Sequence, residues 1–241
     1  MLVICGEQLH FMNPSFEDNL AEVRRRIQAA CERAGRRPEE VRVLAVSKTH
    51  GPDCIREAAA GGLMDFGENR VQEARQKIPL CPTALTWHLI GHLQTNKVKD
   101  AVNLFHLIQA VDSLKLLLAI ETAAEAAGRV MPVFLEVNVS GESSKFGLAP
   151  EAVPGILQAA NGLRRVEIQG LLTMPPLAED PEHARPFFHT LREHRDRWRQ
   201  ETGFELRELS MGMSHDFEIA VEEGATWIRL GSILFGKRNT L

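Results

Sequence analysis

Short apolar runs alternate with amphipathic stretches along almost the whole of this 241-residue chain. The apolar runs have the length of buried strands, and the stretches between them repeat apolar residues at helical spacing. Strands are expected at about residues 41–48, 63–67, 86–91, 104–111, 132–139, 167–173, 206–211 and 226–233. Helices are expected between them, at about residues 52–60, 69–78, 95–102, 113–127, 150–161, 181–202 and 216–223. This strict alternation is the feature that most constrains the fold.

A strand followed by a helix and another strand is the building unit of a parallel sheet. Eight such units in about 200 residues predict a closed (β/α)8 barrel of the TIM type. The alternative is an open, doubly wound sheet, but no GxGxxG motif follows the first strand to support a dinucleotide-binding fold. We find no linker rich in Pro, Ser or Gly, so residues 1–241 are expected to form one α/β domain, with the barrel at about 41–238.

One additional helix is expected before the barrel. Apolar residues recur at helical spacing from Leu20 to Ala34, and arginines and glutamates occupy the other side. Asn13-Pro14-Ser15 supplies a start signal and Gly35 a stop signal. The sequence therefore predicts an N-terminal helix at about 13–35 that packs on the outside of the barrel.

Composition excludes several classes of protein. The 28 Lys and Arg residues are outnumbered by 32 Asp and Glu, which gives a net charge of −4 and excludes a generally basic nucleic-acid binder. No apolar run approaches the roughly 18 residues of a membrane span, and the N-terminus is a poor signal peptide. The 4 cysteines form no CxxC pair, so neither a zinc site nor a disulfide framework is expected. We expect a reduced, cytoplasmic protein with no nucleic-acid or membrane partner.

Lys48 ends the first predicted strand and is the first candidate for chemistry. Because strand side chains alternate between faces, Lys48 shares a side with Leu44 and Val46. Catalytic groups of barrels lie at the carboxyl ends of the strands. A lysine in apolar surroundings has a lowered pKa and can form a Schiff base with an aldehyde. The alternative is a lysine that simply leaves the strand for solvent.

The last two predicted strands carry a second signal. Barrels frequently bind phosphate through the loops that follow strands seven and eight. Gly212 and Gly231 would let backbone N–H groups approach an anion, and Ser214 and Ser232 offer hydroxyl donors. Ser214 also suits the N-cap of a helix that begins near residues 215–216. The alternative is a capping serine with glycines that serve barrel packing.

Arg229 is surrounded by apolar residues in the last strand. A guanidinium is always protonated in practice, and burying it unpaired is costly. It therefore needs a partner, either an acidic side chain of the barrel interior such as Glu136 or an acceptor on a ligand.

Other polar residues give weaker signals. His88 and His92 are four residues apart, but the strand pattern and Gly91 argue against a helical metal pair, so we expect packed or loop histidines and no metal site. Lys145, in the loop after strand five, would face the same mouth of the barrel.

Six blocks of sequence together resemble the family of pyridoxal-phosphate homeostasis proteins, whose barrel resembles the N-terminal domain of alanine racemases. The blocks run in the family's order from about Val41 to Arg238. They are AVSKTH (45–50), DFGENRVQEA (65–74), WHLIGHLQTNK (87–97), EVNVSGESSKFGL (136–148), LSMGMSHDFEIAVEEGATWIRLGS (209–232) and ILFGKR (233–238).

The resemblance implies pyridoxal 5′-phosphate (PLP) as the cofactor and assigns roles to residues of this chain. Lys48 would form the internal aldimine, and Asn69 would lie beside the cofactor. Arg229 would face the pyridine nitrogen, where a permanent charge disfavours protonation of the ring and weakens it as an electron sink. Ser214, Gly231 and Ser232 would hold the phosphate of the cofactor, and Met213 is also assigned to the cofactor site.

These residues are compatible with three functions. The first is a PLP carrier or buffer without strong catalysis, the second a racemase-like PLP enzyme, and the third an aldolase-type barrel. Alanine racemases use a tyrosine opposite their lysine, and this chain has 0 tyrosines. They also carry a C-terminal β-domain that closes the site, and without such a lid a Schiff base stays open to exchange. A sugar phosphate would leave Arg229 without a partner, so the carrier is preferred and the racemase-like enzyme is the alternative.

The expected partners follow from this choice. They are PLP itself and, by extension, apo-enzymes that depend on PLP. Without a second domain the chain is expected to be a monomer. Lys145 is expected to offer a second amine for transient transfer of the cofactor.

Overall fold

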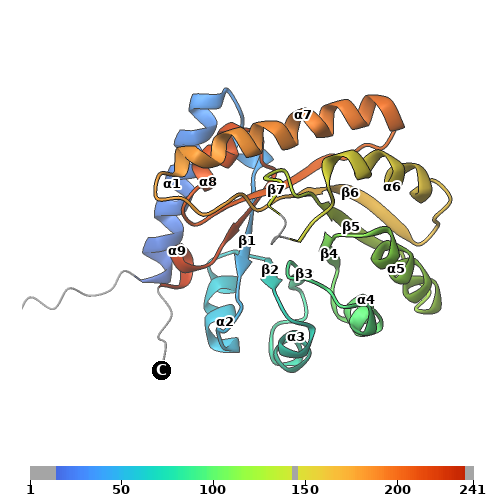
Figure 1. The fold of residues 1–241 in the computed structure, drawn as a ribbon. Helices are drawn as coiled ribbons and strands as arrows, with labels where there is room; N and C mark the ends of the chain where they lie inside the picture. The colour runs from blue at the N-terminus through green and yellow to red at the C-terminus, as the bar shows by residue number, and fades with distance from the viewer. Residues whose placement is uncertain (1–14, 143–145, 237–241) are drawn as a thin grey trace, which may run out of the picture.

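Eight parallel strands close into a barrel in the computed structural model, which describes residues 15–142 and 146–236 (Figure 1). The strands follow one another around the barrel in chain order, and pairing between the first and the last closes it. Their bounds are β1 Arg42–Val46, β2 Asp65–Glu68, β3 Thr86–Leu89, β4 Leu107–Val111, β5 Met131–Glu136, β6 Val166–Leu172, β7 Glu208–Met213 and β8 Trp227–Leu230. The predicted TIM-type barrel is confirmed.

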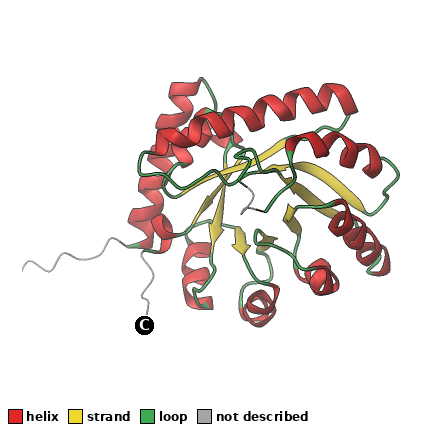
Figure 2. Cartoon of the chain, viewed as in Figure 1, coloured by secondary structure: helices red, strands yellow, loops and turns green. Residues whose placement is uncertain are grey.

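Helices surround the strands on the outside, as Figure 2 shows. Their bounds are α2 Pro52–Ala60, α3 Val71–Lys77, α4 Val98–Leu104, α5 Leu114–Ala126, α6 Val153–Ala160, α7 Arg185–Thr202, α8 Phe217–Glu222 and α9 Ser232–Phe235. Several begin with a short 3-10 turn, as at Pro181–Ala184 before α7. None of the helices in the described ranges combines the length and apolar character that crossing a bilayer requires.

The predicted N-terminal helix is α1, Phe16–Ala34, and its start and stop signals act as expected. Ser15 and Asp18 form a reciprocal capping box that satisfies amide groups of the first turn. Gly35 ends the helix in the left-handed conformation, with φ of 65°. The buried face of α1 includes Leu20 and Val23, and the helix packs against α8 and α9 on the outside of the barrel (Figure 1).

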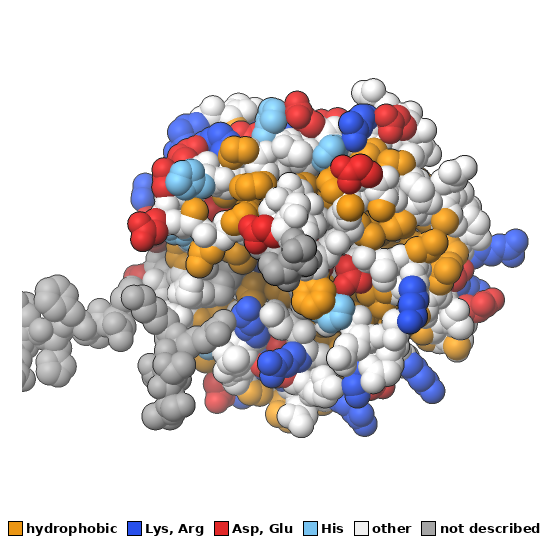
Figure 3. Space-filling model, viewed as in Figure 1, with side chains coloured by type: hydrophobic (Ala, Val, Ile, Leu, Met, Phe, Trp, Pro, Cys, Tyr) orange, Lys and Arg blue, Asp and Glu red, His pale blue; other side chains and the backbone are white. Residues whose placement is uncertain are grey.

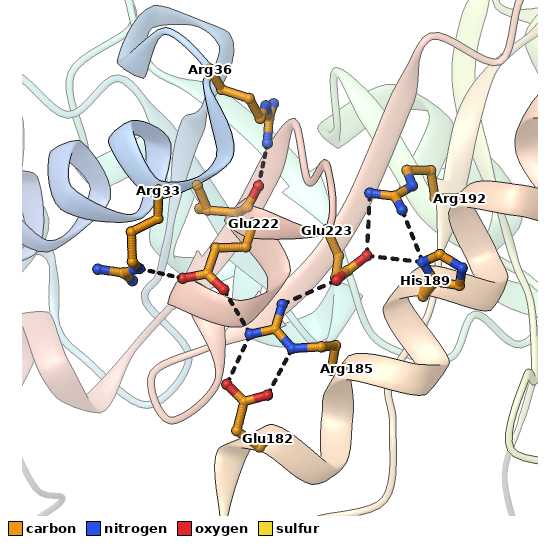
Figure 4. A network of polar contacts seen from close by, with 9 residues as sticks. Arg33, Arg36, Glu182, Arg185, His189, Arg192, Glu222 and Glu223 are labelled. Carbon is orange, nitrogen blue, oxygen red and sulfur yellow. Dashed lines mark hydrogen bonds and ion pairs between the residues drawn. The ribbon is translucent and has the colours of Figure 1, made fainter.

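A network of charged side chains joins α1, α7 and α8 (Figure 4). Arg185 of α7 contacts Glu222 at 2.7 Å and Glu223 at 3.0 Å, both near the end of α8. Arg33 of α1 reaches Glu222 at 2.6 Å from the other side. Because each carboxylate is shared between cations, the network stabilises the packing of three helices that are distant in sequence.

Two apolar clusters form the core. Within β1, Leu44 and Val46 belong to a small cluster that fills the barrel, whereas Ala45 belongs to the large cluster between strands and helices. This is the alternation that the sequence predicts for a barrel strand. The interior cluster is completed by Ile90, Leu107, Phe134, Leu172 and Trp227.

The structure corrects several predicted boundaries; the fifth strand, for example, was expected to reach about residue 139 but ends at Glu136. The last strand was expected to continue to about residue 233, but β8 ends at Leu230, and Ser232–Phe235 is the helix α9. The fourth strand was expected from about 104, but Leu104 still belongs to α4 and β4 begins at Leu107. Short elements of four or five residues give too little periodicity to fix their ends. The first two residues of the predicted N-terminal helix, 13 and 14, lie outside the described residues.

Candidate functional site

Lys48 follows the carboxyl end of β1 and is half-buried. The amide of Ser47 still pairs with the carbonyl of Gly67 at 3.1 Å, so the sheet continues to this residue. The hydroxyl of Ser47 points outward, since it donates to Glu68 in the layer between strands and helices. Residues 48 and 49 then form a turn, which the amide of His50 closes by donating to the carbonyl of Ser47 at 3.0 Å. The interior side expected for Lys48 from strand alternation stays a prediction.

Asn69 follows the carboxyl end of β2, the neighbour of β1. Its side-chain Oδ1 is buried and has no hydrogen-bond partner among the described residues. Gly91, after β3, permits the close approach of this segment, because a Cβ there would lie 2.4 Å from the carbonyl oxygen of Asn69. Asn69 is thus a positioned amide with one unsatisfied acceptor.

The loops after β7 and β8 meet at Ser214. Its hydroxyl accepts hydrogen bonds from the amide of Gly231 at 3.3 Å and from the amide of Ile233 at 3.4 Å. Ser232, the first residue of α9, is exposed beside them. Two amides thus donate to one hydroxyl, which keeps its own proton to donate to an acceptor such as an anion.

Ser214 does not cap α8, which corrects one of the two predicted roles for this residue. Asp216 takes the N-cap position of α8, and its carboxylate accepts from the amide of Met213 at 2.6 Å. Burial raises the pKa of Asp216, against the effect of that hydrogen bond. Ser214 instead accepts from amides at the start of α9, a helix that the sequence analysis did not expect.

The two predicted glycines differ in what requires them. Gly212 has φ of 90°, and a Cβ there would lie 2.5 Å from the Cβ of Ala220, so this glycine permits close packing of α8 on β7. At Gly231 a Cβ would meet the carbonyl oxygen of Val46 at 3.5 Å, an ordinary contact. The contact shows that Gly231 lies against the end of β1, and hence close in the barrel to the segment of Lys48.

Arg229 is 4% exposed and lies in β8. Its Nη1 donates to the hydroxyl of Ser210 at 2.9 Å, and its Nη2 donates to the carbonyl of Thr173 at 3.0 Å. Burial lowers the pKa of Arg229 to about 10, while the charges of Asp216 and Glu136 oppose this shift. Both acceptors that contact the guanidinium within the described part of the chain are thus neutral, and Glu136 acts on it through its charge.

A chain of polar contacts crosses the barrel interior behind Arg229. The hydroxyl of Ser210 donates to Gln109 at 2.6 Å, and the amide of Gln109 lies 2.8 Å from Nδ1 of His88. Nε2 of His88 is 3.6 Å from Asp65. Sequence reasoning missed Ser210 and Gln109, because these partners are 101 residues apart and each alone resembles an ordinary strand residue. His88 is the packed histidine that was predicted.

Acidic groups gather at the ends of β4 and β5. Glu136 is 3% exposed, and burial with the nearby charge of Asp112 raises its pKa to about 7. His92, a loop histidine as predicted, contacts Asp112 at 3.0 Å and stacks on the ring of Phe146. Lys145, the predicted second amine, lies outside the described residues.

The predicted residues thus follow four strands that are neighbours in the barrel, in the order β7, β8, β1, β2. Because carboxyl ends of parallel strands share one edge, Lys48, Asn69, Ser214 and Gly231 lie on one side of the same rim. Arg229 lies below them in β8. Figure 3 shows both acidic and basic side chains near the edge of the face in view, so this face is not uniformly basic.

Comparison with known proteins gives the family. The family model of the alanine racemase N-terminal domain matches residues 19–239. The pyridoxal phosphate homeostasis protein of Aquifex aeolicus is 46% identical over 222 residues, which cover 92% of this chain and 97% of that protein. The chain belongs to the pyridoxal phosphate homeostasis protein family. A second member of this family, from Pseudomonas aeruginosa, is 43% identical over 225 residues, covering 92% of this chain and 95% of that protein.

Solved structures agree with this membership. PipY of Synechococcus elongatus is 38% identical, and its structures without and with PLP bound have TM-scores of 0.84 and 0.81. In both comparisons, 92% of this chain and 100% of PipY are covered. Alanine racemase of Clostridium difficile has a TM-score of 0.70 at 17% identity, covering 92% of this chain and 58% of the racemase, which shows a shared barrel fold.

Proposed function

We propose that the chain binds PLP at this rim, with the cofactor joined covalently to Lys48, and that it carries or buffers PLP rather than using it for turnover. The observation that supports this best is the convergence of three kinds of group on neighbouring strands. An amine follows β1, a set of anion-binding donors follows β7 and β8, and a buried guanidinium lies in β8. PLP carries an aldehyde, a phosphate and a ring nitrogen, which match these groups in kind.

The residues present fit the cofactor. The hydroxyl of Ser214 accepts from the amides of Gly231 and Ile233 and would donate its own proton to the phosphate, with Gly231, Ser232 and Met213 beside it. The buried Oδ1 of Asn69, which has no partner among the described residues, is a site where a ligand donor would relieve an unsatisfied acceptor. The guanidinium has five N–H donors and makes two hydrogen bonds within the described residues, so donors are available for the ring nitrogen.

The covalent link needs only groups that the chain and the cofactor supply. Lys48 would supply the amine that bonds to the aldehyde carbon of PLP, and the aldehyde oxygen would leave as water. When bound in this way, PLP supplies an electrophilic carbon that exchanges readily between amines. Such exchange is what a carrier requires, because loading and release are the same step in opposite directions.

Arg229 supports a carrier over an enzyme. Even with a pKa lowered to about 10 by burial, the guanidinium is protonated at neutral pH, and it can only donate to the ring nitrogen. A ring nitrogen that accepts this bond resists protonation, so the ring is a weaker electron sink than one paired with a carboxylic acid. A racemase of the alanine racemase type uses a tyrosine as the base opposite its lysine, and this sequence contains 0 tyrosines.

The test is an absorbance titration of the purified protein with PLP. We expect the visible band of the Schiff base in the wild type and in Lys115→Ala, which alters an exposed lysine of α5, and no such band in a folded Lys48→Ala variant. The loaded wild type is then incubated with single amino acids. Release of PLP to the amino acid without racemisation supports a carrier, whereas racemisation at a steady turnover supports the enzyme. A Schiff-base band that survives in Lys48→Ala would contradict the assignment of Lys48.

A further inference from the structure

A second lysine lies buried behind the segment of Lys48. Lys77, the last residue of α3, is 7% exposed, and its Nζ donates to the carbonyl of Ser47 at 2.8 Å. The same Nζ lies 2.7 Å from the carboxylate of Glu68 and 2.8 Å from that of Glu73. An ammonium group has three N–H donors, and three acceptors surround it here. Lys77 is therefore held in place as a cation.

The residue after Lys48 is held by the same cluster. The carboxylate oxygen of Glu73 that contacts Lys77 also accepts from the backbone amide of Thr49, at 2.6 Å. On the other side, the hydroxyl of Ser47 donates to Glu68 at 2.6 Å. The backbone is thus fixed immediately before and immediately after Lys48 by side chains from β2 and α3.

Thr49 shows that this fixation constrains the chain. Its φ is 69°, in the left-handed region that β-branched residues rarely adopt. Backbone in such a region persists only where its surroundings hold it, and such residues concentrate at functional sites. Two contacts hold this conformation: the Thr49 amide donates to Glu73 at 2.6 Å, and the amide of His50 donates to the carbonyl of Ser47 at 3.0 Å.

Stability alone does not explain the cluster. Burying a cation and a carboxylate costs solvation energy that a well-packed apolar pair would not lose. Glu68 is fully buried, and its second oxygen, Oε2, has no hydrogen-bond partner among the described residues. An arrangement that leaves a buried acceptor unsatisfied is better explained by what it positions.

We propose that Lys77, Glu68 and Glu73 form a clamp that positions Lys48 for its reaction with an aldehyde. The inference rests on the proposed function, in which Lys48 bonds to PLP. Lys77 acts as a positioning residue through the Ser47 carbonyl, and Glu73 acts through the Thr49 amide. The clamp also separates the roles of the two lysines, because a cation bound to three acceptors has no lone pair for an aldehyde.

The test compares variants of α3 that leave Lys48 intact. Glu73→Met removes the acceptor of the Thr49 amide, and Glu73→Gln retains an acceptor oxygen. The matched control is Gln72→Met, an exposed position on the same helix. Lys77→Met is measured as well, but it leaves the buried Glu68 without its cation, so the partly exposed Glu73 gives the deciding variant if Lys77→Met unfolds.

Two measurements are made on each folded variant. Amide hydrogen exchange of the cofactor-free protein reports on the clamp directly, and we expect exchange at Thr49 to rise about tenfold or more in Glu73→Met. Titration with PLP reports on Lys48, and we expect the dissociation constant to rise about tenfold, because misplacing a reacting group by about 1 Å has effects of this size or larger. Glu73→Gln and Gln72→Met are expected to stay near the wild type in both.

The outcomes distinguish this inference from the proposed function. If the wild type forms no adduct with PLP at Lys48, the proposed function fails, and the purpose of the clamp fails with it. If the wild type forms the adduct but Glu73→Met matches Gln72→Met in PLP affinity, the clamp is overturned while the proposed function stands. Unchanged exchange at Thr49 in Glu73→Met would overturn the clamp whether or not PLP binds.

Discussion

Arg229 donates a hydrogen bond of 2.9 Å to the hydroxyl of Ser210, and that hydroxyl donates onward to Gln109 at 2.6 Å. The two bonds give the hydroxyl a fixed direction, since it accepts from the guanidinium and gives its proton to the amide oxygen. The orientation of Arg229 in β8 therefore depends on a neutral hydroxyl of β7, which Gln109 of β4 holds in turn.

Ser210→Ala is the first variant that this relationship predicts to be damaging. It removes an acceptor from Arg229 and leaves the buried Gln109 oxygen without its donor, which should lower the free energy of unfolding by about 1–3 kcal/mol. PLP affinity should fall as well, because the guanidinium loses one of its two fixed contacts. Chemical denaturation and PLP titration measure these effects. Thr122→Ala on the exposed face of α5 is the control. An equal, small effect of both substitutions would show that the two hydrogen bonds of the Ser210 hydroxyl do not hold Arg229.

Glu136 gives a prediction about pH. Burial raises its pKa in the folded protein to about 7 from a usual value of 4.5, so the folded state favours the protonated carboxyl. This contribution to stability is fully present below about pH 4.5 and is lost as the pH rises through about 7. In Glu136→Gln the loss is absent, so the variant should gain about 3 kcal/mol relative to the wild type between these limits.

The measurement for Glu136 is the difference in unfolding free energy between the two proteins across this pH range. Glu68 and Asp216, whose pKa values are also raised by burial, are present in both proteins and cancel in the difference. A difference that does not vary with pH would show that Glu136 does not titrate in this window.

Gly91→Ala tests the position of Asn69. The added Cβ would lie 2.4 Å from the carbonyl oxygen of Asn69, so the backbone must shift. We expect a loss of about 1–3 kcal/mol in stability and weaker binding of PLP. Gly155→Ala in α6 is the matched control, since nothing lies within 4 Å of its Cβ and the helix should gain about 0.5–1 kcal/mol. If Gly91→Ala binds PLP with the affinity of the wild type, the assignment of Asn69 to the site is wrong.

Arg185→Met tests the network that joins α1, α7 and α8. The arginine contacts Glu182, Glu222 and Glu223 and is 34% exposed, so its loss should cost about 1–2 kcal/mol and matter less at high salt. Arg25→Met is the control, because Arg25 pairs only with the exposed Glu22 among the described residues. If both substitutions lower the unfolding temperature equally at low and at high salt, the network contributes no more to stability than a single exposed ion pair.

The fold was largely predictable because its signals are local. The repeated strand–helix pattern predicted the barrel, and Ser15 and Gly35 predicted the ends of α1. The helix α9 escaped prediction, since Ser232–Phe235 is too short to show a helical period. Its absence from the expected elements is also why Ser214 was assigned to the wrong helix end.

The candidate site was predictable only in part, for a different reason. Lys48 and Arg229 are conspicuous in the sequence because each is a cation in apolar surroundings. The groups that hold the backbone beside Lys48 are not conspicuous, because they are distant in sequence: Glu68 is 21 residues from Ser47, and Lys77 is 30 residues from Ser47. Such partners meet only when β1 pairs with β2 and α3 packs behind them. The predicted roles of Lys145, the monomeric state and the cytoplasmic location remain predictions.

The central claim is tested most directly by trapping the cofactor on the protein. The wild type is incubated with PLP, reduced with borohydride and mapped by peptide mass spectrometry, with Lys77 and Lys115 as internal comparisons. We predict a stable pyridoxyl adduct on Lys48 and none on the buried Lys77. An adduct confined to other lysines, or the absence of any adduct under conditions that saturate the protein with PLP, would contradict the account.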